Sequence, residues 1–490
     1  MEKNLPEILF GTADKAISKS LSRLLKAKKI KKIYPRVYTS NLKDSPEIII
    51  KRNLYVVLGK LFPKAVLSHR TAIEGKPAKS VIFLTYKYTK KIIMPGITVQ
   101  LLKGPLALED DMPFLEGLYI SSMPRSYLEN MQRSGRALQV PKTLPKEVVE
   151  TRLDRICQIH GEERLNQIRD HAREIADHFN MDREFQYLNK IISSLLRTNT
   201  SSKLTSPSAL ARAFGQPYDQ DRLELLQLLF SELKQQELPL IKESQTTVVA
   251  NRNRAFFEAY FSNYIEGTQF EIEEAREIIF DNKVPENRPD DAHDILGAFR
   301  IVSDQKEMII IPESADHLIK LLKRRHEALM GSHPDKSPGM FKEKSNRAGQ
   351  THFVSPELVK GTLTKGYEIY RALDHGLSRS IFMMFLVTEA HPFIDGNGRI
   401  ARIMMNAELV QKNLARIIIP TVYREDYLLA LKALSQKKRF EPFIKMMCRA
   451  QQFTSEVDFA DYDQALETLK KCHAFNEYDE KKLIMPSRLT

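Results

Sequence analysis

Residues 391–402 read His391-Pro392-Phe393-Ile394-Asp395-Gly396-Asn397-Gly398-Arg399-Ile400-Ala401-Arg402. The preceding run from Ile381 to Thr388 is almost wholly apolar, which predicts a helix that is buried on all sides. His391 and Pro392 should end this helix, because the residue before a proline is pushed out of the helical region. We expect a second helix from Arg399 to Val410, so that the residues between the two helices form a tight turn.

The turn brings together residue types that nucleotide phosphate chemistry needs. Gly396-Asn397-Gly398 permits positive φ, where backbone N–H groups can point at one anion. Arg399 and Arg402 share one face at the positive end of the second helix, an arrangement that suits a polyphosphate. Asp395 is a candidate ligand of Mg²⁺, which prefers one or two carboxylates plus phosphate oxygens. His391 is the nearby group that can take a proton at neutral pH.

Simpler interpretations exist for each part of this segment. A lone histidine beside an apolar run is usually a core residue, and Gly-Asn-Gly is usually only a turn. Each of these interpretations explains one part of the segment, but neither explains why all of these residues occur together.

The segment resembles the core motif of the Fic (filamentation induced by cAMP) family, and every motif position is intact. The resemblance implies that AMP passes from ATP to a Ser, Thr or Tyr hydroxyl of a target protein. It implies His391 as general base, Asp395 on Mg²⁺, the glycine turn as anion hole and the two arginines on the nucleotide phosphates. Doc-type relatives, which move a phosphate instead, carry altered turn residues.

A second segment, Pro338-Gly339-Met340-Phe341-Lys342, resembles the start of the flap that this family builds over the target's hydroxyl-bearing segment. His352 and Phe353 resemble its far end. The resemblance implies that the target is contacted by Gly339, Phe341, Lys342, His352 and Phe353. Lys342 stands where arginine is common, so the charge stays and the bidentate fork is lost. Pro-Gly alone would indicate only a surface loop.

A third segment, Ser262-Asn263-Tyr264-Ile265-Glu266-Gly267, concerns control. We expect a helix from Arg254 to Ile265 with Gly267 as its C-cap, and Ser262 and Glu266 lie on one face of it. The segment resembles the family's inhibitory pattern, which implies that Glu266 pairs with Arg402 and keeps it from the γ-phosphate. The alternative is an ordinary helix end with a solvated glutamate. Whether Glu266 serves the reverse reaction, AMP removal, stays open.

The positive charge is concentrated at the N-terminus. The formal net charge is +13 and the pI about 9.3, and residues 1–60 hold 14 Lys and Arg against 5 Asp and Glu. A helix from Asp14 to Lys26 would turn Ile17, Leu21, Leu24 and Leu25 inward, and Lys28 to Thr39 would form a strand–turn–strand wing. The expected DNA contacts are Ser18, Lys19, Ser20 and Arg23 on the helix and Lys31, Lys32 and Arg36 on the wing. A nonspecific basic surface is the alternative.

This arrangement predicts a winged helix-turn-helix. Residues 5–125 also resemble, loosely, the N-terminal part of abortive-infection type IV antitoxins. A second function is therefore a DNA-binding regulator whose Fic domain senses nucleotide or modifies only itself.

The chain as a whole predicts a mainly α-helical protein with a small α/β N-terminal part. Strands are expected within Val81–Leu102, a loop at Thr198–Pro207, and a helix at Arg424–Leu434 whose Tyr427 would face the adenine, by the resemblance. The expected divisions are a DNA-binding domain at 1–60, a small α/β domain at 61–135, a helical linker or dimerisation region at 136–245, the Fic domain with its inhibitory helix at 246–455 and a tail at 456–490.

The cysteine content and the apolar segments indicate the expected cellular compartment. The cysteines Cys157, Cys448 and Cys472 are far apart and give neither a disulfide framework nor a zinc pattern. The N-terminus does not read as a signal peptide, and no apolar run is long enough to cross a membrane. We therefore expect a cytoplasmic protein. The resemblance to the Fic family implies ATP and Mg²⁺ as cofactors and a target protein as partner. The basic N-terminal region adds DNA as a partner, and a homodimer is possible through residues 136–245.

Overall fold

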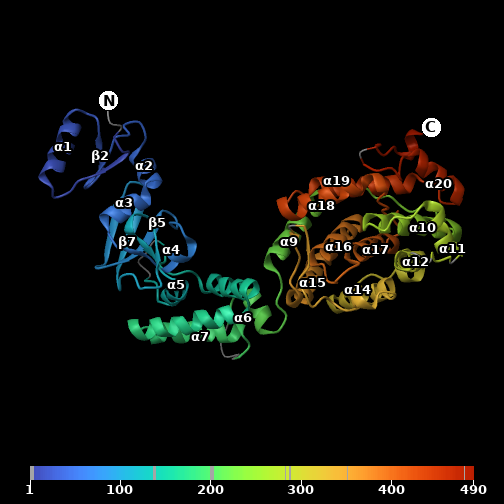
Figure 1. Ribbon diagram of the computed structural model, residues 1–490, viewed down its shortest axis with the longest axis horizontal. Coiled ribbons are helices and arrows are strands. Elements are labelled where there is room, and N and C mark those ends of the chain that lie inside the picture. The colour runs from blue at the N-terminus through green and yellow to red at the C-terminus, as the bar shows by residue number, and fades with distance from the viewer. Residues whose placement is uncertain are drawn as a thin grey trace. The chain divides into compact units, whose positions relative to one another are not determined.

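The computed structural model describes residues 5–135, 140–198, 204–281, 283–285, 288–349, 351–478 and 480–489. The fold is mainly α-helical, as predicted, with β-strands concentrated near the N-terminus (Figure 1). The chain divides into two compact units, Met1–Phe214 and Gly215–Thr490. In the described parts of the chain, the helices include none that combines the length and the apolar character needed to cross a membrane.

The first unit begins with a small antiparallel sheet and one helix. Its strands pair in the order β1-β3-β2. The bounds are β1 Ile8–Phe10, α1 Lys15–Lys26, β2 Lys31–Tyr34 and β3 Val37–Thr39. Asp14 caps α1 by accepting hydrogen bonds from the backbone of Ala16 and Ile17. The predicted helix and hairpin are therefore present.

Two expectations for this region need correction. A winged helix-turn-helix pairs the recognition helix with an earlier helix, but within residues 5–14 the structure has strand β1 and no helix. Ile17 was expected to point inward, and it is 42% exposed, whereas Leu21 is buried. The helix is therefore anchored at fewer positions than its sequence suggested.

The same hydrophobic core continues past residue 60. Ile8 and Val37 from the small sheet share it with Ile82 and Leu84 from a six-stranded sheet of order β6-β7-β5-β4-β9-β8. The structure therefore has no domain boundary at residue 60. The remaining bounds are α2 Pro46–Arg52, α3 Leu54–Leu61, β4 Val66–Leu67, α4 His69–Glu74, β5 Val81–Tyr86, β6 Lys90–Met94, β7 Ile97–Lys103, β8 Met112–Pro113, β9 Tyr119–Ile120 and α5 Met123–Asn130.

Helices follow, as their periodicity predicted. They are α6 Lys146–Phe179, α7 Asp182–Leu195 and α8 Pro207–Ala213, and they pack around a core of their own. Gly161, at φ +80°, interrupts α6. Residues 199–203 of the predicted loop at Thr198–Pro207 lie outside the described residues, and α8 begins at Pro207.

The second unit is a helical domain around one hydrophobic core that runs from Leu225 to Met485. Its bounds are α9 Gln220–Gln235, α10 Val248–Ile265, α11 Ile272–Asp281, α12 Pro289–Ser303, α13 Gln305–Met308, α14 Ala315–Met330, β10 Arg347–Ala348, β11 Thr351–His352, α15 Pro356–Tyr370, α16 Gly376–Ala390, α17 Asn397–Gln411, α18 Arg424–Lys437, α19 Glu441–Glu456 and α20 Tyr462–Lys471. It begins before α9, upstream of the expected boundary at 246. The expected tail is also part of it, since Phe459, Cys472 and Leu483 are core residues.

Helices α16 and α17 form the centre of this domain and pack along one another (Figure 1). The run Ile381–Val387 within α16 is fully buried, as its apolar sequence predicted. Two neighbouring helices thus fix both ends of the turn at 391–396.

Candidate active site

The turn between α16 and α17 is stabilised by hydrogen bonds among its own residues and to the end of α16. His391 ends α16 in the left-handed region at φ +45°, with its N–H on the Val387 carbonyl at 2.9 Å. Gly396, at φ +71°, precedes α17, which begins at Asn397, two residues before the predicted start. The Asn397 side chain accepts from Phe393 N and donates to Phe393 O, both at 2.9 Å. These two hydrogen bonds of the Asn397 amide therefore stabilise the turn.

His391 is arranged as a neutral base. Its Nδ1 lies 3.3 Å from the Thr388 carbonyl, which can only accept, so Nδ1 carries the proton and Nε2 has the free lone pair. Burial, with a smaller effect from Lys342, lowers the pKa of His391 to about 4. The imidazole is therefore unprotonated at neutral pH, as a general base must be.

Asp395 is exposed to solvent. Its side chain is 51% exposed, and Oδ1 accepts a hydrogen bond from Gly396 N at 2.6 Å. The described residues include no ready-made cluster of three or more metal-ligating side chains. One exposed carboxylate fits a Mg²⁺ that arrives with phosphate oxygens already bound to it.

Arg402 points at the end of α10. It donates from Nε to Ser262 Oγ at 3.0 Å and from Nη2 to the Ser262 carbonyl at 2.9 Å and Glu266 Oε1 at 2.6 Å. Glu266 follows α10 directly, and Gly267 leaves the helix at φ +98°. The structure thus brings the predicted inhibitory residues onto Arg402.

The Glu266 carboxylate also lies directly on Gly398. A Cβ at position 398 would stand 2.1 Å from Glu266 Oε1, so only glycine allows this approach. Gly398 lies in the first turn of α17, the positive end of that helix. The carboxylate therefore occupies the place at which an anion would meet α17.

The two motif arginines do not have the same surroundings. Arg399 is buried, and its Nη1 lies 2.6 Å from Asp294 Oδ2 on α12. The same Nη1 is 3.4 Å from Asn263 Oδ1 on α10. Arg399 therefore ties α17 to α12 and α10. Tyr427, expected at the adenine, is also buried, and Arg402 lies beside its hydroxyl.

The flap is attached to the turn by its backbone and by Lys342. Lys342 N donates to the Pro392 carbonyl at 2.9 Å, and its Nζ donates to Asn346 Oδ1 at 2.6 Å. Asn346 Nδ2 in turn donates to the Phe393 carbonyl at 3.0 Å. Only 3% of Lys342 is exposed, and burial lowers its pKa to about 8. The lysine therefore supports the base of the flap.

Aromatic rings extend this attachment. Phe341 packs edge-on against Phe393 at 5.4 Å. Phe353 stacks on His391 with centroids 3.6 Å apart. His352 is exposed in β11, where it pairs with Arg347 of β10. The flap hairpin thus lies over the histidine of the turn.

Two further residues of this site, His326 and Arg222, were not predicted from the sequence. His326 on α14 accepts from Gly339 N at 3.0 Å and lies 3.1 Å from the Asp395 carbonyl, and its ring stacks on Phe393 at 3.7 Å. Arg222 on α9 donates to the His352 carbonyl at 2.6 Å and pairs with buried Glu389 at 2.6 Å. Both hold the flap to the turn. A histidine within an amphipathic helix and an arginine far upstream carry no local signal for this role.

The predicted DNA contacts fall into two groups. Ser18, Lys19, Ser20 and Arg23 are exposed on α1, and Lys32 and Arg36 are exposed on the hairpin. Lys31 instead donates to the carbonyls of Leu42 and Asp44, at 3.2 and 2.7 Å. It supports the loop after the hairpin.

Curated proteins resemble this chain over about half of its length. Over 239 residues the chain is 26% identical to the protein adenylyltransferase Fic of Drosophila erecta, covering 47% of this chain and 46% of that protein. The corresponding Drosophila melanogaster protein is 25% identical over 239 residues, 47% of each chain. The chain thus spans about half the length of the curated relatives it matches.

Solved structures are similar at low identity. Fic-1 of C. elegans aligns over 69% of this chain and 95% of its own, at 17% identity and a TM-score of 0.36. A Fic family protein of Desulfovibrio desulfuricans aligns over 53% and 78%, at 18% identity and a TM-score of 0.35. The family model of the Fic/DOC family matches residues 317–409, which contain His326, the flap and the turn. Residues 317–409 of this chain therefore form a domain of the Fic/DOC family.

Proposed function

We propose that this protein is a cytoplasmic protein adenylyltransferase that moves AMP from ATP to a Ser, Thr or Tyr hydroxyl of a target protein. The carrying observation is a neutral His391 on the same tight turn as the half-exposed Asp395 and the positive end of α17. The names of the curated relatives support the same activity. The free cysteines are compatible with a reducing compartment.

The chemistry follows from the roles of the side chains. His391 Nε2 takes the proton of the target hydroxyl while that oxygen attacks the α-phosphorus of ATP. The bond between the α-phosphorus and the bridging oxygen breaks, and pyrophosphate leaves. Mg²⁺ held by Asp395 supplies charge neutralisation at the phosphates. Backbone N–H groups at the start of α17 face the negative charge that develops on the α-phosphate.

We further propose that Glu266 inhibits this reaction. Its carboxylate accepts a 2.6 Å hydrogen bond from Arg402 and lies on Gly398, where a phosphate would otherwise bind. ATP then has to displace it or bind in an unproductive position. The charge-assisted hydrogen bond favours the inhibited state.

The test is incubation of the full chain with Mg²⁺ and ATP labelled on the α-phosphate. Label should reach protein, and His391→Ala should abolish it. His171→Ala is the matched control, because His171 is exposed on α6 in the first unit. An undiminished rate in His391→Ala would refute the mechanism, and transfer of the γ-phosphate label would make the protein a phosphotransferase.

A second function, DNA binding, is supported by the N-terminal charge. The surplus of basic residues in 1–60 includes Lys19 and Arg23, which are exposed on α1, and Lys32 and Arg36, which are exposed on the hairpin. Such an array suits the phosphates of duplex DNA. The protein would then be a regulator that carries a Fic enzyme.

A further inference from the structure

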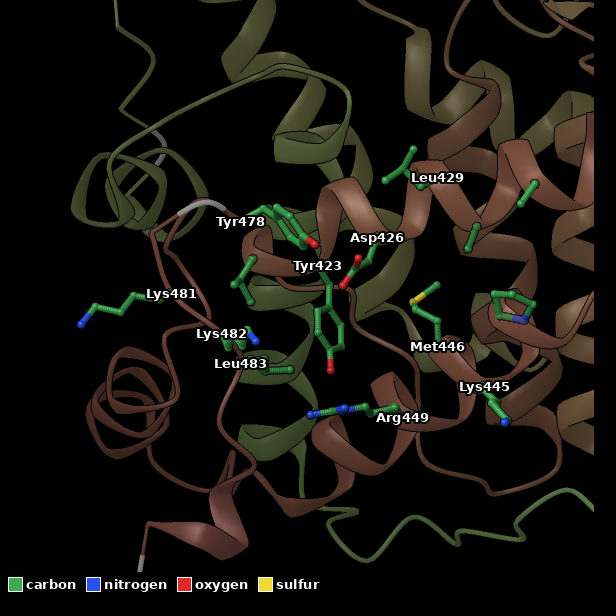
Figure 2. A pocket seen from close by; sticks show the side chains of 14 residues that line it. Tyr423, Asp426, Leu429, Lys445, Met446, Arg449, Tyr478, Lys481, Lys482 and Leu483 are labelled. Atoms are coloured by element: carbon green, nitrogen blue, oxygen red, sulfur yellow. The ribbon is translucent and has the colours of Figure 1, made fainter.

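A pocket lies away from the catalytic turn, between α18, α19, Tyr478 and residues 481–483 (Figure 2). It encloses about 780 Å³. Tyr423 and Ala430 form buried parts of its floor, with Leu429 and Met446 on its walls. Tyr427, which is buried beside Arg402, is not among its lining residues. The pocket is therefore separate from the site described above.

The margin of the pocket is strongly basic. The lining includes Lys445, Arg449, Lys481 and Lys482, all of them exposed, and one carboxylate, Asp426. Figure 2 shows Arg449 next to Tyr423, and its guanidinium carbon lies 5.9 Å from the centre of that ring. A planar cation against an aromatic ring, above an apolar floor, suits a flat aromatic body that carries an anionic group. The Asp426 carboxylate adds an acceptor for a polar hydrogen of such a ligand.

Chain neighbours of two lining residues contact the inhibitory helix. Tyr478 lines the pocket, and Glu477, the residue before it, accepts a hydrogen bond from the Tyr264 hydroxyl. Tyr264 lies two residues before Glu266. Tyr423 also lines the pocket, and Arg424, the residue after it, donates to the Ile265 carbonyl at 3.2 Å. The two residues that precede Glu266 are therefore held by direct neighbours of the pocket.

We propose that this pocket is a second ligand site, for a small aromatic anion, and that an occupant strengthens the hold on Glu266. The ligand offsets the repulsion among the basic side chains and fastens Tyr478 and residues 481–483 to α18 and α19. Glu477 and Arg424 are then held more firmly against α10, so Glu266 stays on Arg402. The effect on activity rests on the proposed inhibition by Glu266, whereas the binding itself does not.

The binding test is a ¹⁹F NMR titration of the full chain with 4-fluorophenyl phosphate. Saturable binding is expected, and Arg449→Ala should weaken it about ten-fold, because the charge-assisted contact to the anion is lost. Lys432→Ala, an exposed cation of α18 that does not line the pocket, is the control and should bind normally. Loss of binding in Arg402→Ala with normal binding in Arg449→Ala would put the probe in the catalytic site and overturn the proposal.

The coupling test compares initial AMP transfer rates with and without saturating probe. The probe should lower the wild-type rate about five-fold, within the usual range of coupling between sites. It should have no effect in Glu266→Gly and little in Glu477→Ala. A probe that competes with ATP would still inhibit Glu266→Gly, which would overturn the coupling. If no variant transfers AMP, the proposed function fails, while the NMR result still decides whether the site exists.

Discussion

The imidazole of His391 lies flat against the ring of Phe353, with centroids 3.6 Å apart and planes 5° from parallel. His391 belongs to the turn after α16, and Phe353 to the end of the flap. The stack covers one face of the base, and burial is the largest cause of its lowered pKa. One aromatic contact therefore links the position of the flap to the protonation of His391.

Replacing Phe353 with Ala should raise the pKa of His391 from about 4 toward 6.5. Protonation inactivates a general base, so activity is lost as pH falls through that pKa. The acid limb of the pH profile of kcat/KM for AMP transfer should therefore move to higher pH in Phe353→Ala. Phe353→Leu, which keeps most of the burial, should move it less. A limb that stays in place would show that Phe353 does not control the base.

Much of this site follows from local sequence. The apolar run at Ile381–Val387 specified a buried helix, and Gly396 specified a positive φ after it. The approach of Glu266 to Arg402 was expected from a family pattern, since the two lie on helices that are far apart in the chain.

Other contacts of two motif residues could not be predicted, for a common physical reason. Asn397 was expected at the nucleotide, which stays a prediction, and its side chain also satisfies both backbone groups of Phe393. Arg399 was grouped with Arg402 by spacing, and its guanidinium also pairs with Asp294 on α12. Such partners come from distant parts of the chain, so spacing within the motif contains no information about them.

His326 should make the flap sensitive to acid. Gly339 N donates to its Nδ1, so Nε2 carries the proton and donates to the Asp395 carbonyl. Burial lowers the pKa of His326 to about 4, against 6.5 for the unfolded chain. Between these values the unfolded state binds more protons, so stability falls as pH falls from 6.5 to 4, by about 3 kcal/mol at most.

The measurement is hydrogen exchange by mass spectrometry on the peptide that contains Gly339, between pH 7 and pH 4.5. Exchange, corrected for the intrinsic rate, should accelerate toward acid in the wild type. His326→Asn, which keeps an acceptor near Gly339 but does not titrate, should flatten this dependence. Equal pH dependence in both proteins would exclude His326 as its source.

Lys19 and Arg23 should bind duplex DNA through its phosphates. Both are exposed on α1, and each phosphate contact contributes about 0.9 to the log–log salt slope. A fluorescence anisotropy titration of the full chain should show affinity that falls steeply with salt. Lys19→Ala and Arg23→Ala should weaken binding and each reduce the slope. Lys31→Ala should alter it less, because Lys31 is engaged with Leu42 and Asp44. Absence of binding at low salt would leave α1 as a protein-interaction surface.

Glu266→Gly should raise the initial rate of AMP transfer at saturating ATP by roughly ten-fold or more, which corresponds to about 1.4 kcal/mol in the barrier. The substitution removes the carboxylate from Arg402 Nη2 and from the space above Gly398. Arg402 is then free for the γ-phosphate, which aligns the α-phosphate with the attacking hydroxyl. Self-labelling should appear first, since the enzyme is its own nearest target.

Two further variants separate inhibition from other roles of Glu266. Arg402→Ala should transfer AMP slowly with or without Glu266→Gly, because Arg402 itself binds the γ-phosphate once Glu266 has released its guanidinium. Glu271 is a glutamate that lies beyond the end of α10, so Glu271→Gly should leave the rate of AMP transfer unchanged. Equal rates in wild type and Glu266→Gly would mean that the pair with Arg402 is structural. A lower rate in Glu266→Gly would instead assign Glu266 to catalysis, as expected if it activates water for AMP removal, and the release of AMP from labelled protein would then be the reaction to measure.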